Sequence, residues 1–393
     1  MSPRMQRLAV ALGLALAIWL GVRPYRSNLE LPPNTTDGVF WVLRGAPSQP
    51  GWTDWVFRTQ HFGVGYRPVT ALSYSLDHLV GGLDPRVYRA TDLGLFALAG
   101  LLVYALFRSL ARDLPRWAGV AAVCAFLFHP SAEYVVPILA RRSYLLATVF
   151  SLGALVAFTR SLQPPRTRAS TAAGVGAGAL LGLAILSNEA SVVTLALLPL
   201  IAQRDAESAS AWRRALRACA IPGALALLVI LYRLWVVGGI GGYTVAGPQA
   251  RGAGSVFASA WRSLVPWLGA QDARALAASI AFTALVLPFY AWRGFWVPAF
   301  RARRAAERLP LVFVAWLLAT ALLYAALGVW WHRMAFFLLA PFALLVGTLL
   351  GAGFPRPRDG KLALAGGALP QLVLLGMLLL HSPALHGQSA AWR

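Results

Sequence analysis

Long apolar runs separated by short polar segments dominate this sequence. Segments rich in basic residues alternate with segments that contain most of the acidic residues. Six segments, at residues 1–7, 108–116, 160–168, 204–217, 293–308 and 356–361, contain 20 of the 35 Lys and Arg residues. Most of the acidic residues lie instead in the alternate gaps. A helix of roughly 20 apolar residues crosses a bilayer core about 30 Å thick. The pattern therefore predicts a polytopic membrane protein.

The composition supports an all-α membrane fold. Hydrophobic residues make up 58% of the chain and charged residues only 12%, which leaves far too little polar surface for a soluble protein of 393 residues. We expect about 11 transmembrane helices, within a range of 10–13, in a single membrane domain covering residues 1–393. The candidate spans are 8–22, 89–107, 117–132, 143–159, 169–188, 190–203, 218–236, 275–292, 309–331, 334–354 and 362–381.

The basic segments also set the expected orientation. Short cytoplasmic loops retain Lys and Arg, so the six Arg-bearing segments are predicted to face the cytoplasm. The N-terminus is then cytoplasmic, and with eleven spans the tail from His381 lies outside. The first run lacks a small-residue cleavage signature and is interpreted as an uncleaved anchor. We expect location in the plasma (inner) membrane.

The first extracytoplasmic loop, residues 23–88, is far longer than a connection between two spans requires. It is rich in Trp, Tyr and Phe, which favour the boundary between membrane and water. We expect short helices lying on the membrane surface there. Asp37 and Asp54 lie in this loop and are the candidate catalytic carboxylates.

Two further acids occupy the same predicted face. Glu133 follows Pro130 at the end of a span, and Glu189 with Asn188 interrupts an otherwise apolar stretch. An ionisable group at membrane depth is a functional hypothesis by default. The alternative for Glu189 is a solvated tip of a helical hairpin.

Arginines accompany these acids although outer loops disfavour positive charge. The candidate binding residues on this face are Arg67, Arg141, Arg142, Arg333 and the neighbouring His332. A planar guanidinium suits bidentate binding of phosphate. Anionic lipid headgroups are the other explanation. Carboxylates beside arginines at a membrane surface suggest a base acting next to a phosphate leaving group.

Other sites are disfavoured by the residue patterns. The net charge of +21 is spread over loops with no nucleic-acid motif, so no nucleic-acid partner is expected. Cys124 and Cys219 are interpreted as small apolar residues. The six histidines show no metal-ligand spacing, and two aspartates 16 residues apart are poor support for a cation site. We predict no cofactor, and a divalent metal is the alternative left open.

Several short motifs resemble a known family when taken together in order. They are Tyr66-Arg67-Pro68-Val69, Leu72-Ser73-Tyr74, Gly82-Leu83-Asp84-Pro85, His129-Pro130 with Glu133, Arg141-Arg142, Ser187-Asn188-Glu189, and Tyr232 followed by Gly238-Gly239 and Gly241-Gly242-Tyr243. The sequence resembles the membrane region of polytopic GT-C type glycosyltransferases, particularly the protein O-mannosyltransferase-like group that carries a TPR tail. The resemblance spans residues 10–350 and is strongest over 60–245.

The resemblance implies transfer of a sugar, with mannose the first expectation, from a polyprenyl-phosphate carrier to an acceptor hydroxyl on the non-cytoplasmic face. It places the general base at Asp37, where a carboxylate would take the acceptor proton. Arg67, Arg141, Arg142 and Arg333 would stabilise the departing phosphate. Glu133 and Glu189 match acidic positions of the family. The implied partners are the lipid-linked donor, membrane lipid, and a lipid, polysaccharide or protein acceptor.

This chain departs from the family pattern at several positions. A single acid, Asp37, stands where the family often has two, which makes Asp54 the next candidate base. Asn188 replaces a usual Lys, His332 replaces a usual Glu, and the TPR tail is absent. Two alternatives stay open: a polytopic lipid or sugar transporter or flippase, and a catalytically inactive GT-C relative. A transporter would favour broken midplane helices and internal repeats, which the sequence does not show.

Overall fold

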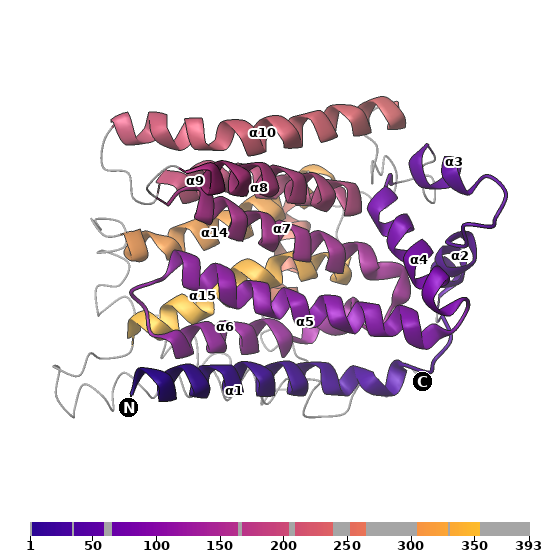
Figure 1. Cartoon of the computed structure of the whole chain (residues 1–393), viewed down its shortest axis with the longest axis horizontal. Coiled ribbons are helices and arrows are strands. Elements are labelled where there is room, and N and C mark those ends of the chain that lie inside the picture. Colours follow the sequence, from indigo (N-terminus) through magenta and orange to yellow (C-terminus); the bar gives the residue numbers. More distant parts are fainter. Residues whose placement is uncertain are drawn as a thin grey trace.

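The computed structural model describes residues 2–33, 35–58, 65–163, 167–203, 209–238, 252–264, 305–328 and 331–353. Within these ranges the regular elements are helices, and the long ones run side by side as a bundle (Figure 1). The all-α prediction is confirmed. The long helices are α1 (Pro3–Val22), α5 (Pro85–Leu110), α7 (Arg142–Ser161), α8 (Arg168–Ser187), α10 (Ala209–Val237), α14 (Ala305–Ala326) and α15 (Phe336–Gly353).

Shorter helices complete the bundle and its ends. These are η1 (Arg23–Asn28), α2 (Thr36–Arg44), α3 (Trp52–Phe57), α4 (Pro68–Gly81), α6 (Arg116–Leu127), η2 (Pro130–Tyr134), η3 (Leu139–Arg141), η4 (Glu189–Val192), α9 (Val193–Gln203), α11 (Ala253–Leu264) and η6 (His332–Ala335).

Seven helical stretches among the described residues are long and apolar enough to cross a membrane, and α6 and η4–α9 form two shorter apolar helices. Nine of the eleven predicted runs coincide with these helices. The runs 275–292 and 362–381 lie outside the described residues, so the total of eleven spans stays a prediction.

One span is shorter than expected. The run 117–132 was expected to be continuous, but α6 ends at Leu127. His129 adopts an extended backbone and Pro130 begins η2. Proline disfavours a helical conformation in the residue before it and has no N–H to donate, which explains the break. The chain therefore continues through η2 and η3, the segments that position Glu133 and Arg141.

Helix α7 lies at the centre of the bundle, and most of its residues are buried. It packs against α5 and α8, and α8 packs in turn against α10. Glycine permits the close approach of α8 and α10: a Cβ atom on Gly178 would lie 2.7 Å from Leu225 Cδ1, and one on Gly182 would lie 2.9 Å from Val229 Cγ2. The ridge of small residues in α8 is therefore filled by a neighbouring helix.

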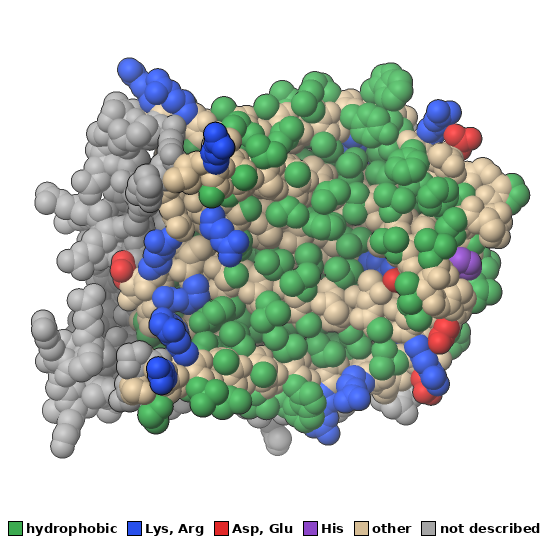
Figure 2. All heavy atoms as spheres, viewed as in Figure 1, with side chains coloured by type: hydrophobic (Ala, Val, Ile, Leu, Met, Phe, Trp, Pro, Cys, Tyr) green, Lys and Arg blue, Asp and Glu red, His purple; other side chains and the backbone are tan. Residues whose placement is uncertain are grey.

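Helices α2, α3 and α4 form a small layer at one end of the bundle (Figure 1). Their aromatic side chains pack together, with Trp41 stacked on Tyr74 at 5.4 Å between ring centroids and Trp55 at 5.5 Å from Trp41. The first loop thus folds into short helices, as predicted. In Figure 2 the acidic side chains lie mostly at this end, whereas many Lys and Arg side chains gather at the opposite end.

Candidate active site

Asp37 lies in the first turn of α2. The side chain of Thr35 accepts a hydrogen bond of 3.0 Å from the backbone N–H of Gly38 and so caps the helix. Asp37 is exposed at this N-terminus, where the helix dipole favours a negative charge. The sequence Thr35-Thr36-Asp37 therefore fixes the carboxylate at the start of a short helix.

The start of α2 packs against η3, which ends at Arg141. A Cβ atom on Gly38 would lie 3.7 Å from the Cβ atom of Leu139. Arg141 interacts electrostatically with both Asp37 and Arg333. Arg141 is thus near both the predicted base, about 100 positions earlier in the chain, and a second predicted phosphate-binding arginine, about 190 positions later.

Side chains from η2 and η6 complete this group, which we call the outer cluster: Asp37, Tyr134, Arg141, His332 and Arg333. Arg141 donates a hydrogen bond to the carbonyl of Tyr134. The Tyr134 ring stacks on His332, with centroids 5.0 Å apart and an interplanar angle of 20°. The Arg333 guanidinium lies 4.6 Å from the centroid of the Trp331 ring. These contacts position the side chains of Arg141, on η3, and Arg333, on η6.

Glu133 lies on η2 next to Tyr134 and interacts electrostatically with Tyr25. Burial raises the pKa of its carboxyl above the ordinary value. Its buried Oε1 has no hydrogen-bond partner among the residues that the structure describes. Burial of this kind destabilises the charged form of the carboxyl relative to its neutral form.

A second group surrounds Glu189, and we call it the Glu189 cluster: Tyr66, Arg67, Glu189, Tyr232 and Arg233. Arg67 lies 3.3 Å from Glu189 Oε1 and Arg233 lies 3.9 Å from Glu189 Oε2. The hydroxyls of Tyr66 and Tyr232 are 3.1 Å apart. The cluster ties the first loop to η4 and α10.

Charge explains the state of Glu189. Burial alone would raise the pKa of this carboxyl, but the guanidiniums of Arg67 and Arg233 outweigh that effect and hold the pKa below its ordinary value. Two arginines and one carboxylate leave a net positive charge at a nearly buried position. Such a cluster suits a second anion.

Arg142 takes a different position from its neighbour Arg141. Its side chain is fully buried and forms ion pairs of 2.5 Å with Asp77 and 2.6 Å with Asp92. It also donates a 2.7 Å hydrogen bond to the carbonyl of Tyr88 and lies 4.2 Å from the centroid of the Tyr74 ring. The geometry favours a structural role for Arg142 over the predicted phosphate binding.

Asp77, Asp92 and Arg89 were not among the site residues predicted from the sequence. Arg89 donates hydrogen bonds to the carbonyls of Leu31, Pro32 and Pro137, at 3.0, 3.0 and 2.8 Å. It thereby ties the first loop to the segment before η3. The available signal was the presence of Arg89 and Asp92 near the start of the apolar run 89–107, because charged residues at such positions are usually paired.

Asp54 is placed outside the outer cluster. It lies on α3 and forms an exposed ion pair of 3.4 Å with Arg58 one turn along the helix. The geometry therefore favours Asp37 as the base. Within the described ranges, no three His, Cys, Asp or Glu side chains gather where they could hold a metal ion.

Comparison with known proteins gives matches at the level of structure. No protein-family model matches the sequence, and no curated protein does. The ArnT structure from Cupriavidus metallidurans bound to undecaprenyl phosphate superposes with a TM-score of 0.56 at 15% identity, covering 97% of this chain and 77% of that one. Oligosaccharyltransferase from Archaeoglobus fulgidus, tethered to an acceptor peptide, gives 0.56 at 14% identity.

A second structure of the archaeal enzyme, AglB with an inhibitory peptide and a dolichol-phosphate, gives a TM-score of 0.55 at 14% identity and covers 98% of this chain. The present chain spans 55% of the oligosaccharyltransferase chain that carries the tethered acceptor peptide. At such identities the likeness concerns the fold. The chain shares the helical fold of the ArnT and oligosaccharyltransferase structures.

Proposed function

We propose that this protein transfers a sugar from a polyprenyl-phosphate carrier to an acceptor hydroxyl on the non-cytoplasmic face of the membrane. The observation that supports this most strongly is the outer cluster, in which Arg141 interacts electrostatically with both Asp37 and Arg333. The three residues come from separate parts of the sequence. Together they provide a proton acceptor next to cations able to hold a phosphate.

The reaction follows from these groups. The Asp37 carboxylate takes the proton of the acceptor hydroxyl as its oxygen attacks the anomeric carbon. The bond between that carbon and the phosphate oxygen breaks, and the bonding electrons leave with the lipid phosphate. Arg141 and Arg333 stabilise the charge that gathers on this leaving group. One displacement of this kind inverts the anomeric centre, because attack and departure occur on opposite faces.

The Glu189 cluster is the second part of the proposed donor site. Arg67 and Arg233 are held together by one carboxylate and have excess positive charge. Two solved relatives in fold were determined with undecaprenyl phosphate and with dolichol-phosphate, which supports a lipid phosphate as the ligand class. We place Arg67 at this phosphate, and Glu189 as the group that orients it.

Mannose is the proposed sugar, from the motif resemblance to protein O-mannosyltransferase-like proteins. The acceptor is a lipid, a polysaccharide or a protein hydroxyl. The outer cluster is proposed to face the extracytoplasmic side of the plasma membrane, since many of the described Lys and Arg side chains lie at the other end of the bundle (Figure 2).

The test is a transfer assay with purified protein in liposomes. Undecaprenyl-phosphate mannose labelled in the sugar is the donor, and a membrane extract from cells lacking the gene supplies acceptors. We expect labelled product with the wild-type protein and none with Asp37→Asn. Parallel reactions with glucose and galactose donors assign the sugar.

The same liposomes separate the rival functions. Movement of labelled donor lipid between leaflets without any glycosidic product would identify a transporter or flippase. Neither product nor movement with any of the donors, from correctly folded protein, would identify an inactive relative. Either result overturns the proposed transfer.

A further inference from the structure

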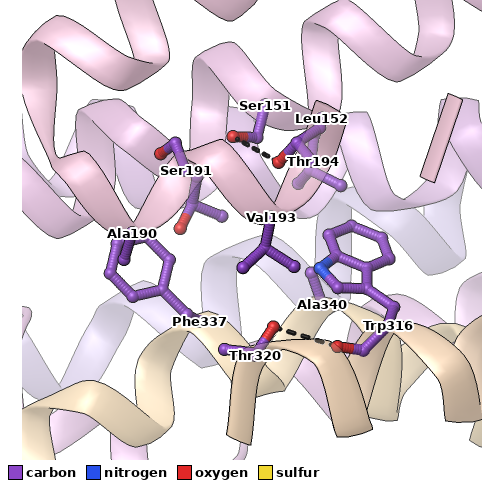
Figure 3. Close-up of a pocket in the computed structure, with 11 residues that line it drawn as sticks. Ser151, Leu152, Ala190, Ser191, Val193, Thr194, Trp316, Thr320, Phe337 and Ala340 are labelled. Atoms are coloured by element: carbon purple, nitrogen blue, oxygen red, sulfur yellow. Dashed lines mark hydrogen bonds between the residues drawn. The ribbon is translucent and has the colours of Figure 1, made fainter. Parts of the chain in front are cut away.

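A small cavity lies inside the bundle, between α7, η4–α9, α14 and α15 (Figure 3). Its volume is about 20 Å³. Five hydroxyl-bearing side chains line it, although the surrounding helices are apolar: Thr148, Ser151, Ser191, Thr194 and Thr320. A concentration of hydroxyls around one cavity within membrane helices needs an energetic explanation.

Three of the five hydroxyls have protein partners. Ser151 and Thr194 lie 3.2 Å apart, and Thr320 donates a 3.0 Å hydrogen bond to the carbonyl of Trp316 (Figure 3). The other two are Thr148 Oγ1 and Ser191 Oγ, on residues that are 4% and 3% exposed. Neither has a hydrogen-bond partner in the described part of the chain. Leaving a buried hydroxyl unsatisfied costs about 1–3 kcal/mol.

We propose that this cavity is a water-binding site in which ordered water bridges Thr148 on α7 to Ser191 on η4. A cavity needs about 10–15 Å³ to hold one water, which in turn needs two to four polar partners. The volume and the hydroxyl lining meet both requirements. The paired hydroxyls of Ser151 and Thr194 offer further acceptor positions.

The bridge has a positional consequence. Ser191 lies two residues after Glu189 on the same turn, and Thr148 lies on the helix that begins with Arg142. Water held between them fixes the turn that bears Glu189 against the central helix. This inference concerns the internal packing and stands whether or not the protein transfers a sugar.

Removing a hydroxyl group distinguishes a hydrated cavity from a dry one, because the melting temperature should change in opposite directions in the two cases. In a dry cavity, Thr148→Val removes an unsatisfied hydroxyl at nearly constant volume, so the protein should melt at the same or a higher temperature. In a hydrated cavity the same change removes a hydrogen bond to water. We then expect Tm of the full-length protein in detergent to fall by about 1–3 °C.

The matched control is Thr348→Val, because the Thr348 hydroxyl is also buried but donates within its own helix to the Leu344 carbonyl at 2.8 Å. In a hydrated cavity we expect Thr148→Val and Ser191→Ala each to lower Tm as the control does, because each change removes one buried hydrogen bond. The double variant should lose less than the sum of the two, since either change breaks the bridge. A Tm for Thr148→Val at or above that of the wild type, or strictly additive losses, would overturn the proposal.

Discussion

Arg141 and Arg142 are adjacent in the chain but occupy opposite environments. Arg142 is wholly buried between Asp77 and Asp92, whereas Arg141 is partly exposed and interacts with Asp37 and Arg333. The backbone changes from η3 to α7 between them, so their side chains diverge. Arg142 thus stabilises the packing of the helices, and the adjacent Arg141 lies at the candidate site.

The first prediction concerns the proposed base. Asp37→Asn keeps the shape of the side chain but cannot accept the acceptor proton, so transfer should fall by at least about 100-fold. Membrane insertion and Tm should change little, because Asp37 is exposed. Asp54→Asn is the matched control and should retain most of the activity. Undiminished transfer by Asp37→Asn, measured in the liposome assay, would move the base elsewhere.

The second prediction concerns the contribution of Arg142 to the stability of the fold. Arg142→Met leaves the carboxylates of Asp77 and Asp92 buried without their cation, which should cost about 3–5 kcal/mol of stability. Thermal unfolding in detergent measures this as a large fall in Tm. Arg86→Met removes an exposed pair with Glu30 and should leave Tm nearly unchanged. A similar Tm for both variants would show that the buried network does not stabilise the fold.

The third prediction uses pH. Burial raises the pKa of Glu133 above its ordinary 4.5, so the folded protein binds this proton more tightly than the unfolded chain does. Stability therefore falls as pH rises through 4.5 towards the folded-state pKa. Glu133→Gln, which cannot ionise, should raise Tm at pH 7 and should match the wild type at pH 4. A Tm difference that is the same at both values would contradict this account.

The fourth prediction addresses Arg67. Arg67→Lys keeps the charge but loses the planar fork, so it should weaken donor binding and raise KM for the polyprenyl-phosphate donor about 10-fold. Arg58→Lys, an exposed arginine of the same loop, is the control and should leave KM unchanged. Steady-state kinetics with varied donor measure both. A fall in kcat without any change in KM would place Arg67 away from the donor.

The fifth prediction is topological. Reporter fusions after residues 60 and 250 should lie outside the cytoplasm, and fusions after residues 165 and 360 should lie inside it. Paired alkaline phosphatase and fluorescent protein fusions report the two locations. A cytoplasmic location for residue 60 would place the first loop, with Asp37, on the wrong side for an extracytoplasmic donor.

The local features of this fold were predictable because they depend on short stretches of sequence. Lengths of apolar runs predicted nine of the described helices, and Pro130 explains the one that ends early. The fates of individual arginines were not predictable. Arg141 and Arg142 have the same side chain, and only the approach of Asp77 and Asp92 from other helices decides which one is buried.

The sequence by itself determined that the chain is a helical membrane protein, that acids and arginines share its first-loop end, and that its motifs resemble those of GT-C proteins. The lengths of the apolar runs and the positions of the basic residues are properties of the sequence, and they are enough to predict membrane helices and their orientation. The tertiary structure decided which charges meet: Asp37 with Arg141, and Arg67 with Glu189. Electrostatic and hydrogen-bonding interactions act over a few ångströms, so they depend on how distant segments pack rather than on their separation along the chain.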